Sequence, residues 1–224
     1  MPGKLFALPL LAGANWHERW IAALGALIGI GLTALVSTLI AGDTGAGLLL
    51  AAPIGASAVL VFGVPSSPLG QPWPVIGGNI VSTLCGVAAA HWLGHGALAA
   101  GVAVSSAILG MSALRCLHPP GGGTALLGAI GGPAILAHGY AFALVPMGLN
   151  AILLVATGIA FHRFSGHSYP HRPAPMPAQP RLLGEDIDAA LADLGETFDV
   201  SREDLQALLE RAERHAEARK ISKR

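Results

Sequence analysis

The interior of this chain contains almost no charge. Between Thr44 and His162 the only formally charged side chain is that of Arg115, and charged residues make up 12% of the whole chain. Hydrophobic residues make up 53%, and the mean hydropathy is +0.60. A water-soluble domain of this length needs a far more charged surface. The shortage of charge therefore excludes an ordinary soluble globular domain and indicates a protein that lies in the lipid bilayer.

The same interior lacks the groups that most enzymes and metal sites use. Asp43 is the only acidic residue between Arg19 and Arg163, so no pair of carboxylates is available for acid–base catalysis. The two cysteines, Cys85 and Cys116, lie in apolar segments without metal-ligand spacing and are expected to be free thiols. We expect no enzymatic activity, no metal and no cofactor. The net charge of zero gives no reason to expect nucleic-acid binding.

Charge returns in the last part of the chain, where ten basic and eleven acidic residues occur from Arg163 onward. This asymmetry predicts three parts: a transmembrane domain over 1–164, a linker rich in proline and histidine over 165–181, and a polar helical tail over 182–224. Ser201, followed by two acidic residues, is the expected N-cap of a tail helix. We expect residues 201–219 to contact a cytoplasmic partner.

Hydropathy predicts an all-α, polytopic transmembrane bundle. Five apolar segments are long enough to cross a bilayer: 20–41, 47–64, 75–92, 96–117 and 140–161. Arg19 precedes the first and Arg163 follows the last, which places both termini in the cytoplasm and requires an even number of crossings. The broken apolar piece 124–138 would then supply the sixth. Four long spans plus two partial ones would give the same parity.

The most unusual stretch follows Arg115. His118, two prolines and three glycines interrupt the helix, and Thr124 opens a new apolar run. Unpaired amides at a helix start carry partial positive charge and attract anions, and Arg115 and His118 would add hydrogen-bond donors. A second interruption, 65–74, contains four prolines and no charge.

These two interruptions supply the candidate substrate-binding residues. They are Arg115, His118, Gly121, Gly122, Gly123 and Thr124 in the first, with Ser67, Gln71 and Asn79 in or just after the second. Pro119, Pro120, Pro65 and Pro68 are expected to shape the backbone. In the competing interpretation, Arg115 only anchors the topology, His118 caps carbonyls freed by the prolines, and the glycines only allow close packing.

Two motifs resemble a known family. Leu117-His118-Pro119-Pro120-Gly121-Gly122-Gly123-Thr124-Ala125-Leu126 is similar to the signature of the HPP family of integral membrane proteins. The second match begins at Gly55-Ala56-Ser57-Ala58 and continues through Ser67-Pro68-Leu69-Gly70-Gln71-Pro72 to Gly78. The resemblance covers about residues 15–164. It departs at Trp73–Pro74, at Asn79 and at Gly123, where the family commonly has Arg-Asn, His and Ala.

The resemblance implies a bundle that is usually described with about four spans, and some family members are associated with nitrite transport. Many bacterial members carry C-terminal CBS domains, and 199–215 resembles the connector that precedes them. We therefore expect a short or truncated member without CBS domains, in the bacterial inner membrane.

The leading functional hypothesis is a transporter or channel for a small inorganic anion, nitrite-like, with its site at the broken helix. The alternatives are a membrane sensor or scaffold that positions a cytoplasmic regulatory tail, and a transporter of another small solute. Small-residue faces such as Gly25 and Gly29 also suggest a homodimer.

Overall fold

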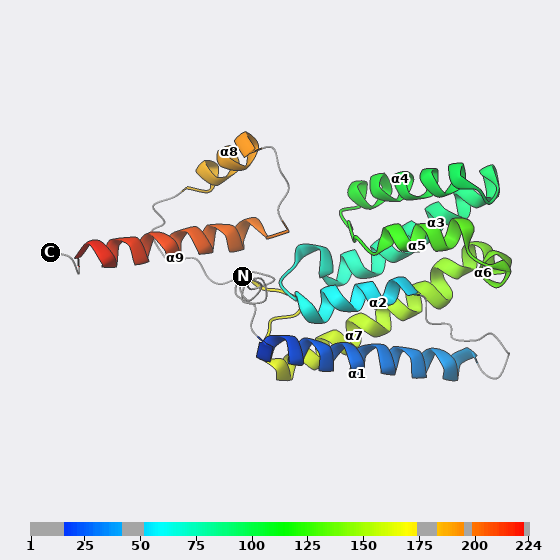
Figure 1. The fold of residues 1–224 in the computed structure, drawn as a ribbon, viewed down its shortest axis with the longest axis horizontal. Helices are drawn as coiled ribbons and strands as arrows, with labels where there is room; N and C mark the ends of the chain where they lie inside the picture. Colours follow the sequence, from blue (N-terminus) through cyan, green and yellow to red (C-terminus); the bar gives the residue numbers. More distant parts are fainter. Residues whose placement is uncertain (1–15, 42–51, 174–182, 195–198, 222–224) are drawn as a thin grey trace, which may run out of the picture.

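A computed structural model describes residues 16–41, 52–173, 183–194 and 199–221. Within these ranges the regular structure is entirely helical, as expected. The bundle contains α1 (Trp16–Ala41), α2 (Ala52–Ala58) continued by η2 (Val59–Gly63), α3 (Pro72–Leu93), α4 (Ala97–Ala113), α5 (Gly121–Ile130) and α7 (Leu149–Ser165). Successive helices run in alternating directions, so α1 begins and α7 ends at the same end of the bundle (Figure 1).

The described residues thus contain six apolar helical segments, which differ in length. Trp16–Ile40, Pro72–Leu93 and Ile135–Ser165 are long enough to cross a membrane. Ala97–Ala113 is shorter, and Ala52–Gly63 and Gly121–Ile130 are shorter still. At about 1.5 Å per residue these last two reach roughly 15–18 Å, about half of a 30 Å hydrocarbon layer. The described part of the second expected segment is therefore a half-length helix, and its first residues, 47–51, lie outside the described ranges.

The broken piece expected over 124–138 is two helices. α5 ends at Ile130, and Pro133 occupies the first turn of α6 (Pro133–His138), where its missing N–H leaves no bond unmade. Short irregular turns, η4 (Gly139–Ala143) and η5 (Leu144–Gly148), then lead into α7. The break between α5 and α6 is thus caused by Gly131 and Gly132 followed by proline.

The helices cross closely where glycines face one another. A Cβ on Gly86 of α3 would collide with the carbonyl of Ala125 in α5, and one on Gly128 would lie 3.0 Å from the carbonyl of Thr83. Glycine at both positions therefore lets α3 and α5 touch backbone to backbone. Cys85 and Cys116 are both free, as the sequence predicts.

The small-residue face of α1 is used inside the protomer. A Cβ on Gly25 would lie 2.6 Å from the Phe62 ring, and one on Gly29 would lie 2.5 Å from it. Phe62 in turn packs edge to face on Phe161 of α7, with ring centroids 5.6 Å apart. These two glycines therefore make room for an aromatic ring of the same chain.

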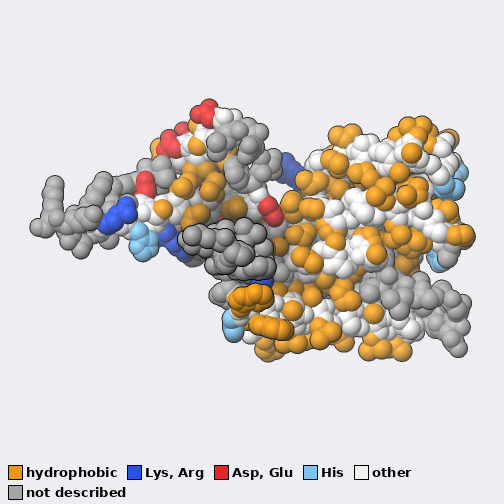
Figure 2. Space-filling model, in the orientation of Figure 1, with side chains coloured by type: hydrophobic (Ala, Val, Ile, Leu, Met, Phe, Trp, Pro, Cys, Tyr) orange, Lys and Arg blue, Asp and Glu red, His pale blue; other side chains and the backbone are white. Residues whose placement is uncertain are grey.

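The tail contains α8 (Gly184–Leu194) and α9 (Arg202–Ile221). The amide of Asp204 donates to Ser201 Oγ over 3.1 Å, so Ser201 is the N-cap of α9 as predicted. Figure 2 shows hydrophobic side chains spread over the bundle, whereas acidic and basic side chains gather over the tail. The polar tail lies at the end of the bundle where α1 begins (Figure 1).

Candidate functional site

Four uncharged polar side chains form a buried network inside the bundle. Ser57 of α2, Asn79 of α3, His118 of the loop before α5 and Thr124 of α5 all have no exposed surface. Burying a polar group is costly unless it is hydrogen-bonded. Each of the four is bonded, and the network joins three helices that are distant in the sequence.

His118 bonds through both ring nitrogens. Nδ1 lies 2.9 Å from the carbonyl oxygen of Leu69, which can only accept, so Nδ1 carries a proton. Nε2 lies 2.8 Å from Ser57 Oγ. In a neutral imidazole Nε2 accepts, so the Ser57 hydroxyl donates to it. The same hydroxyl lies 3.1 Å from the carbonyl oxygen of Pro53 and can donate there when Nε2 is the donor.

Asn79 connects the remaining members. Its Nδ2 donates to Ser57 Oγ over 3.3 Å and to the Val75 carbonyl over 2.8 Å. Its Oδ1 accepts from the Thr124 hydroxyl over 2.7 Å. An uncharged amide thus occupies a central position of the network.

Glycine at position 78 lets the His118 loop approach α3. A Cβ there would lie 2.5 Å from the Cβ of His118 and 2.8 Å from the carbonyl oxygen of Cys116. Both distances are shorter than van der Waals contact, so any side chain would push the loop away. The Gly-Gly-Asn sequence of α3 thus has two roles in the site: Gly78 leaves space for the His118 loop, and the Asn79 amide bonds to the network.

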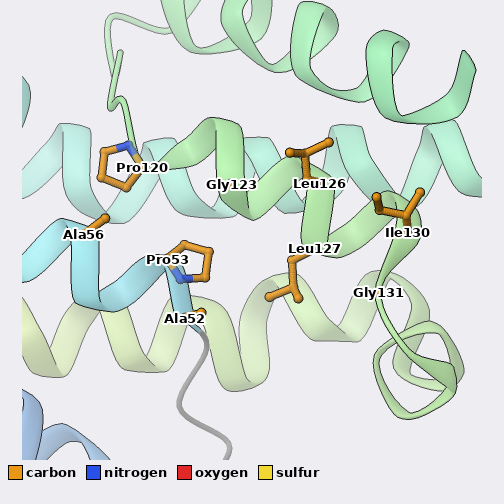
Figure 3. Close-up of a pocket in the computed structure, with 9 residues that line it drawn as sticks. All are labelled: Ala52, Pro53, Ala56, Pro120, Gly123, Leu126, Leu127, Ile130 and Gly131. Carbon is orange, nitrogen blue, oxygen red and sulfur yellow. The ribbon is translucent and has the colours of Figure 1, made fainter. Parts of the chain in front are cut away.

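A pocket of about 520 Å³ lies between α2 and α5, beside the network. Pro53 near the start of α2 faces Pro120 and Gly123 at the start of α5 across it, and Leu126 and Leu127 continue its wall (Figure 3). The first turns of the two half-length helical segments therefore border the same space.

The candidate amides of α5 are largely occupied. The N–H of Gly121 donates to the His118 carbonyl over 2.8 Å, and those of Gly122 and Thr124 donate to the carbonyls of Pro119 and Pro120, each over 3.1 Å. Gly121 is buried, whereas Gly123 is exposed on the pocket wall. Because these amides are already bonded, the start of α5 offers the pocket the positive end of its helix dipole but few unpaired amides.

Arg115 lies outside the network. Its backbone has φ 54°, its N–H donates to Ser112, and the next amide, that of Cys116, donates to Met111. This bonding pattern is the Schellman motif, in which glycine usually occupies the left-handed position that Arg115 takes here. The Trp73 indole N–H donates to the carbonyl of Leu114 at the same helix end, and the Arg115 side chain is exposed.

Neither Ser67 nor Gln71 bonds to the network: Ser67 contacts the tail, and Gln71 bonds within its own loop. Ser67 Oγ donates to both carboxylate oxygens of Asp199, over 2.8 and 3.0 Å. Gln71 Nε2 donates to the carbonyls of Pro65 and Ser67. Pro68 starts a short 3-10 turn, η3 (Pro68–Gly70), which places the carbonyl of Leu69 against His118.

Of the predicted site residues, the structure thus brings together His118, Thr124 and Asn79 with the backbone of 121–123. The sequence showed Ser57 within a motif, but its contact with His118 depends on how two helices pack. The roles of the Leu69 carbonyl and of Asp199 could not be predicted from the sequence. Every residue has a backbone carbonyl, and nothing distinguishes Asp199 from the other carboxylates of the tail.

The chain matches the family model described as "HPP, transmembrane region" over residues 12–170. It is similar to two transmembrane proteins of Dictyostelium discoideum: 34% identical over 168 residues, covering 73% of this chain and 56% of the relative, and 34% identical over 122 residues, covering 53% and 39%. The chain thus spans about half the length of these relatives or less. No solved structure matches it. Since the family model covers more than half of the chain, the chain belongs to the HPP transmembrane-region family and is an integral membrane protein.

Proposed function

We propose that this protein transports a small inorganic anion of the nitrite class, and that the anion passes the pocket between α2 and α5. The observation that carries the proposal is the convergence of two helix starts, at Pro53 and at Pro120–Gly123, on one pocket (Figure 3). Helix N-termini carry partial positive charge, which attracts anions without a formal charge that would hold them too tightly. Half-length helices that meet inside a bundle are a recurrent way to build such sites in transporters.

The composition of the site supports the same proposal. From Ala52 to Ser165 the chain contains no Asp or Glu, so no fixed negative charge repels an anion. The network of Ser57, Thr124, Asn79 and His118 lies behind the pocket wall, and its hydroxyl, amide and imidazole groups are buried and hydrogen-bonded to one another. A hydroxyl that can rotate between two acceptors can also turn toward a passing solute.

Orientation forms part of the proposal. The start of α1 and the end of α7 share one end of the bundle (Figure 1), and Arg115 lies there too, because Leu114 contacts Trp73 near the start of α3. With Arg19 and Arg163 this end carries three cations, which favours the cytoplasmic side of a bacterial inner membrane.

The test is nitrite flux into proteoliposomes, compared between wild type and Thr124→Val. This change removes the hydroxyl and keeps the shape of the side chain, and we expect flux to fall roughly tenfold, the factor for about 1.4 kcal/mol. Thr157→Val is the matched control, because the Thr157 hydroxyl only donates to Leu153 within α7. Absence of nitrite flux from the wild type, with the fold intact, would overturn the proposal.

A sensor or scaffold is the second candidate, supported by the hydrogen bonds that join Ser67 of the bundle to Asp199 of the tail. A sensor would tolerate Thr124→Val without loss of signalling and would carry no flux. Binding of a cytoplasmic protein to the tail, measured with and without the bundle variants, separates the two.

A further inference from the structure

The loop over residues 65–71, here called the proline loop, is held from two sides. On its inner side the Leu69 carbonyl accepts from His118 Nδ1 over 2.9 Å. On its outer side Ser67 donates to the Asp199 carboxylate over 2.8 Å, and Ser67 is only 4% exposed. Leu69, which bonds to the buried network, and Ser67, which bonds to the tail carboxylate, are therefore only two positions apart in the loop.

The segment that follows α7 adds two further bonds to this loop. The hydroxyl of Tyr169, itself buried, donates to the carbonyl of Gly70 over 3.0 Å. The amide of His171 donates to Gln71 Oε1 over 2.8 Å. Burial raises the pKa of the Tyr169 hydroxyl, so this group keeps the proton that it donates.

The outer contacts are themselves tied to α9 and to α1. His171 Nε2 donates to the carboxylate of Asp204 over 2.8 Å, and Asp204 belongs to the first turn of α9. His167 Nε2 pairs with Glu18 of α1 over 2.8 Å. Residues 167–171 and 199–204 thus form one connected strap across the end of the bundle.

We propose that this strap controls the buried site, with Asp199 as a positioning residue that acts through the proline loop to hold His118 against Ser57. Release of α9, for example by a protein that binds its exposed face, would free Ser67 and let the loop move. A hydrogen bond is lost once its atoms separate beyond about 3.5 Å, so a shift of less than 1 Å at Leu69 is enough to release His118.

The structure leaves room for such a movement. A pocket of about 700 Å³ lies beside the strap and is bordered by Pro65 and Ser66 of the loop, Glu18 of α1, and His167 and Asp199. The loop can therefore move outward without displacing a packed helix. An effect of this movement on transport rests on the proposed function. The coupling of Asp199 to His118 does not.

The test compares Asp199→Ala with Asp199→Asn and Asp188→Ala in full-length protein reconstituted in nanodiscs. Asp199→Ala removes the acceptor of Ser67, Asp199→Asn keeps one acceptor oxygen, and Asp188→Ala removes a tail carboxylate that pairs with Arg202. Two signals are followed: the ¹⁵N resonances of the His118 ring and the hydrogen exchange of amides 66–71. Nitrite flux in proteoliposomes is measured separately.

We expect Asp199→Ala to shift the His118 resonances and to speed amide exchange in the loop roughly tenfold, as follows when a hydrogen bond to a charged group is lost. Asp199→Asn should restore most of the wild-type signals, and Asp188→Ala should leave them unchanged. Flux should change severalfold in Asp199→Ala and Ser67→Ala and stay near the wild-type level in Asp199→Asn and Asp188→Ala. Ser67→Ala, which breaks the same bond from the bundle side, should reproduce the Asp199→Ala signals.

Unchanged His118 resonances in both folded Asp199→Ala and Ser67→Ala would overturn the coupling, whatever the flux. Shifted resonances in a protein that carries no nitrite would uphold the coupling and reject the proposed function instead. The two failures are therefore distinguishable.

Discussion

The hydroxyl of Ser57 and the imidazole of His118 lie 2.8 Å apart, although 61 residues separate them in the chain. This contact joins the two stretches that resemble the HPP family, one on α2 and the other in the loop before α5. Both side chains are fully buried, so the hydrogen bond between them serves polar atoms that water does not reach. The two stretches therefore meet at one site in this protein rather than forming two separate packing motifs.

Removal of the imidazole should destabilise the bundle. His118→Ala leaves the Leu69 carbonyl without its donor and opens a cavity, and we expect a loss of about 2–3 kcal/mol in the free energy of unfolding. Denaturant unfolding in detergent measures the change. His91→Ala, which removes an exposed histidine, should have little effect. Equal losses in both variants would show that His118 contributes nothing specific.

Arg115→Gly should stabilise the protein. The Arg115 backbone has φ 54°, a conformation that costs a residue with a Cβ about 1 kcal/mol more than glycine. Thermal unfolding should therefore shift upward in Arg115→Gly and stay constant in Arg115→Gln, which keeps the strain and removes the charge. If flux falls equally in both variants, the charge matters for transport. Unchanged flux in both would reduce Arg115 to a helix-end and topology residue.

Gly78→Ala should be poorly tolerated. The added methyl group would lie 2.5 Å from the Cβ of His118, so the loop must move, and overpacking of this kind costs about 1–3 kcal/mol. Gly101→Ala in α4 is the matched control, since nothing lies within 4 Å of its Cβ position. In an open helical position alanine stabilises by about 0.5–1 kcal/mol. The two substitutions should therefore move the unfolding midpoint in opposite directions, and a parallel shift would contradict the packing described.

Acid should release the contact between α8 and α9 only at a pH below the usual pKa range of an aspartate. The hydrogen bonds from Arg202 lower the pKa of the Asp188 carboxyl, so the carboxylate stays charged in the folded tail as the pH falls. Its contribution is complete above the pKa of the unfolded chain and is lost as the pH falls through the lowered value. An NMR titration of the Asp188 carboxyl checks this. The midpoint should rise toward the ordinary value in Arg202→Gln, and an unchanged midpoint would contradict the pairing.

Several features of the fold follow directly from the sequence. A long interior with one formal charge can lie only in a membrane, and the Gly-Gly-Pro run over 131–133 ends one helix and starts the next. The ends of α5, the start of α6 at Pro133 and the cap at Ser201 are local consequences of this kind. The half-length of α5 was harder to predict, because hydropathy continues across Gly131 and Gly132 although the helix does not.

Other features depend on contacts between distant residues. The sequence predicted His118, Thr124 and Asn79 as parts of a site, because they lie in or just after the two proline-rich interruptions and can donate hydrogen bonds. It could not pair Ser67 with the tail or Gln71 with the linker, since their partners, Asp199 and the amide of His171, lie 132 and 100 residues away. Nor could it show that Arg115 takes a left-handed backbone conformation, which is set by how α4 ends against Trp73.

The sequence by itself thus determined the membrane class, the helical segments, the chain breaks and the polar residues that must find partners, because hydropathy and backbone geometry act locally. Only the tertiary structure decided which of those residues meet. The close crossing of α3 with α5 and the absence of a side chain at Gly78 bring His118 to Ser57 and Asn79 to Thr124. Those contacts depend on the packing of whole helices, which no local pattern in the sequence specifies.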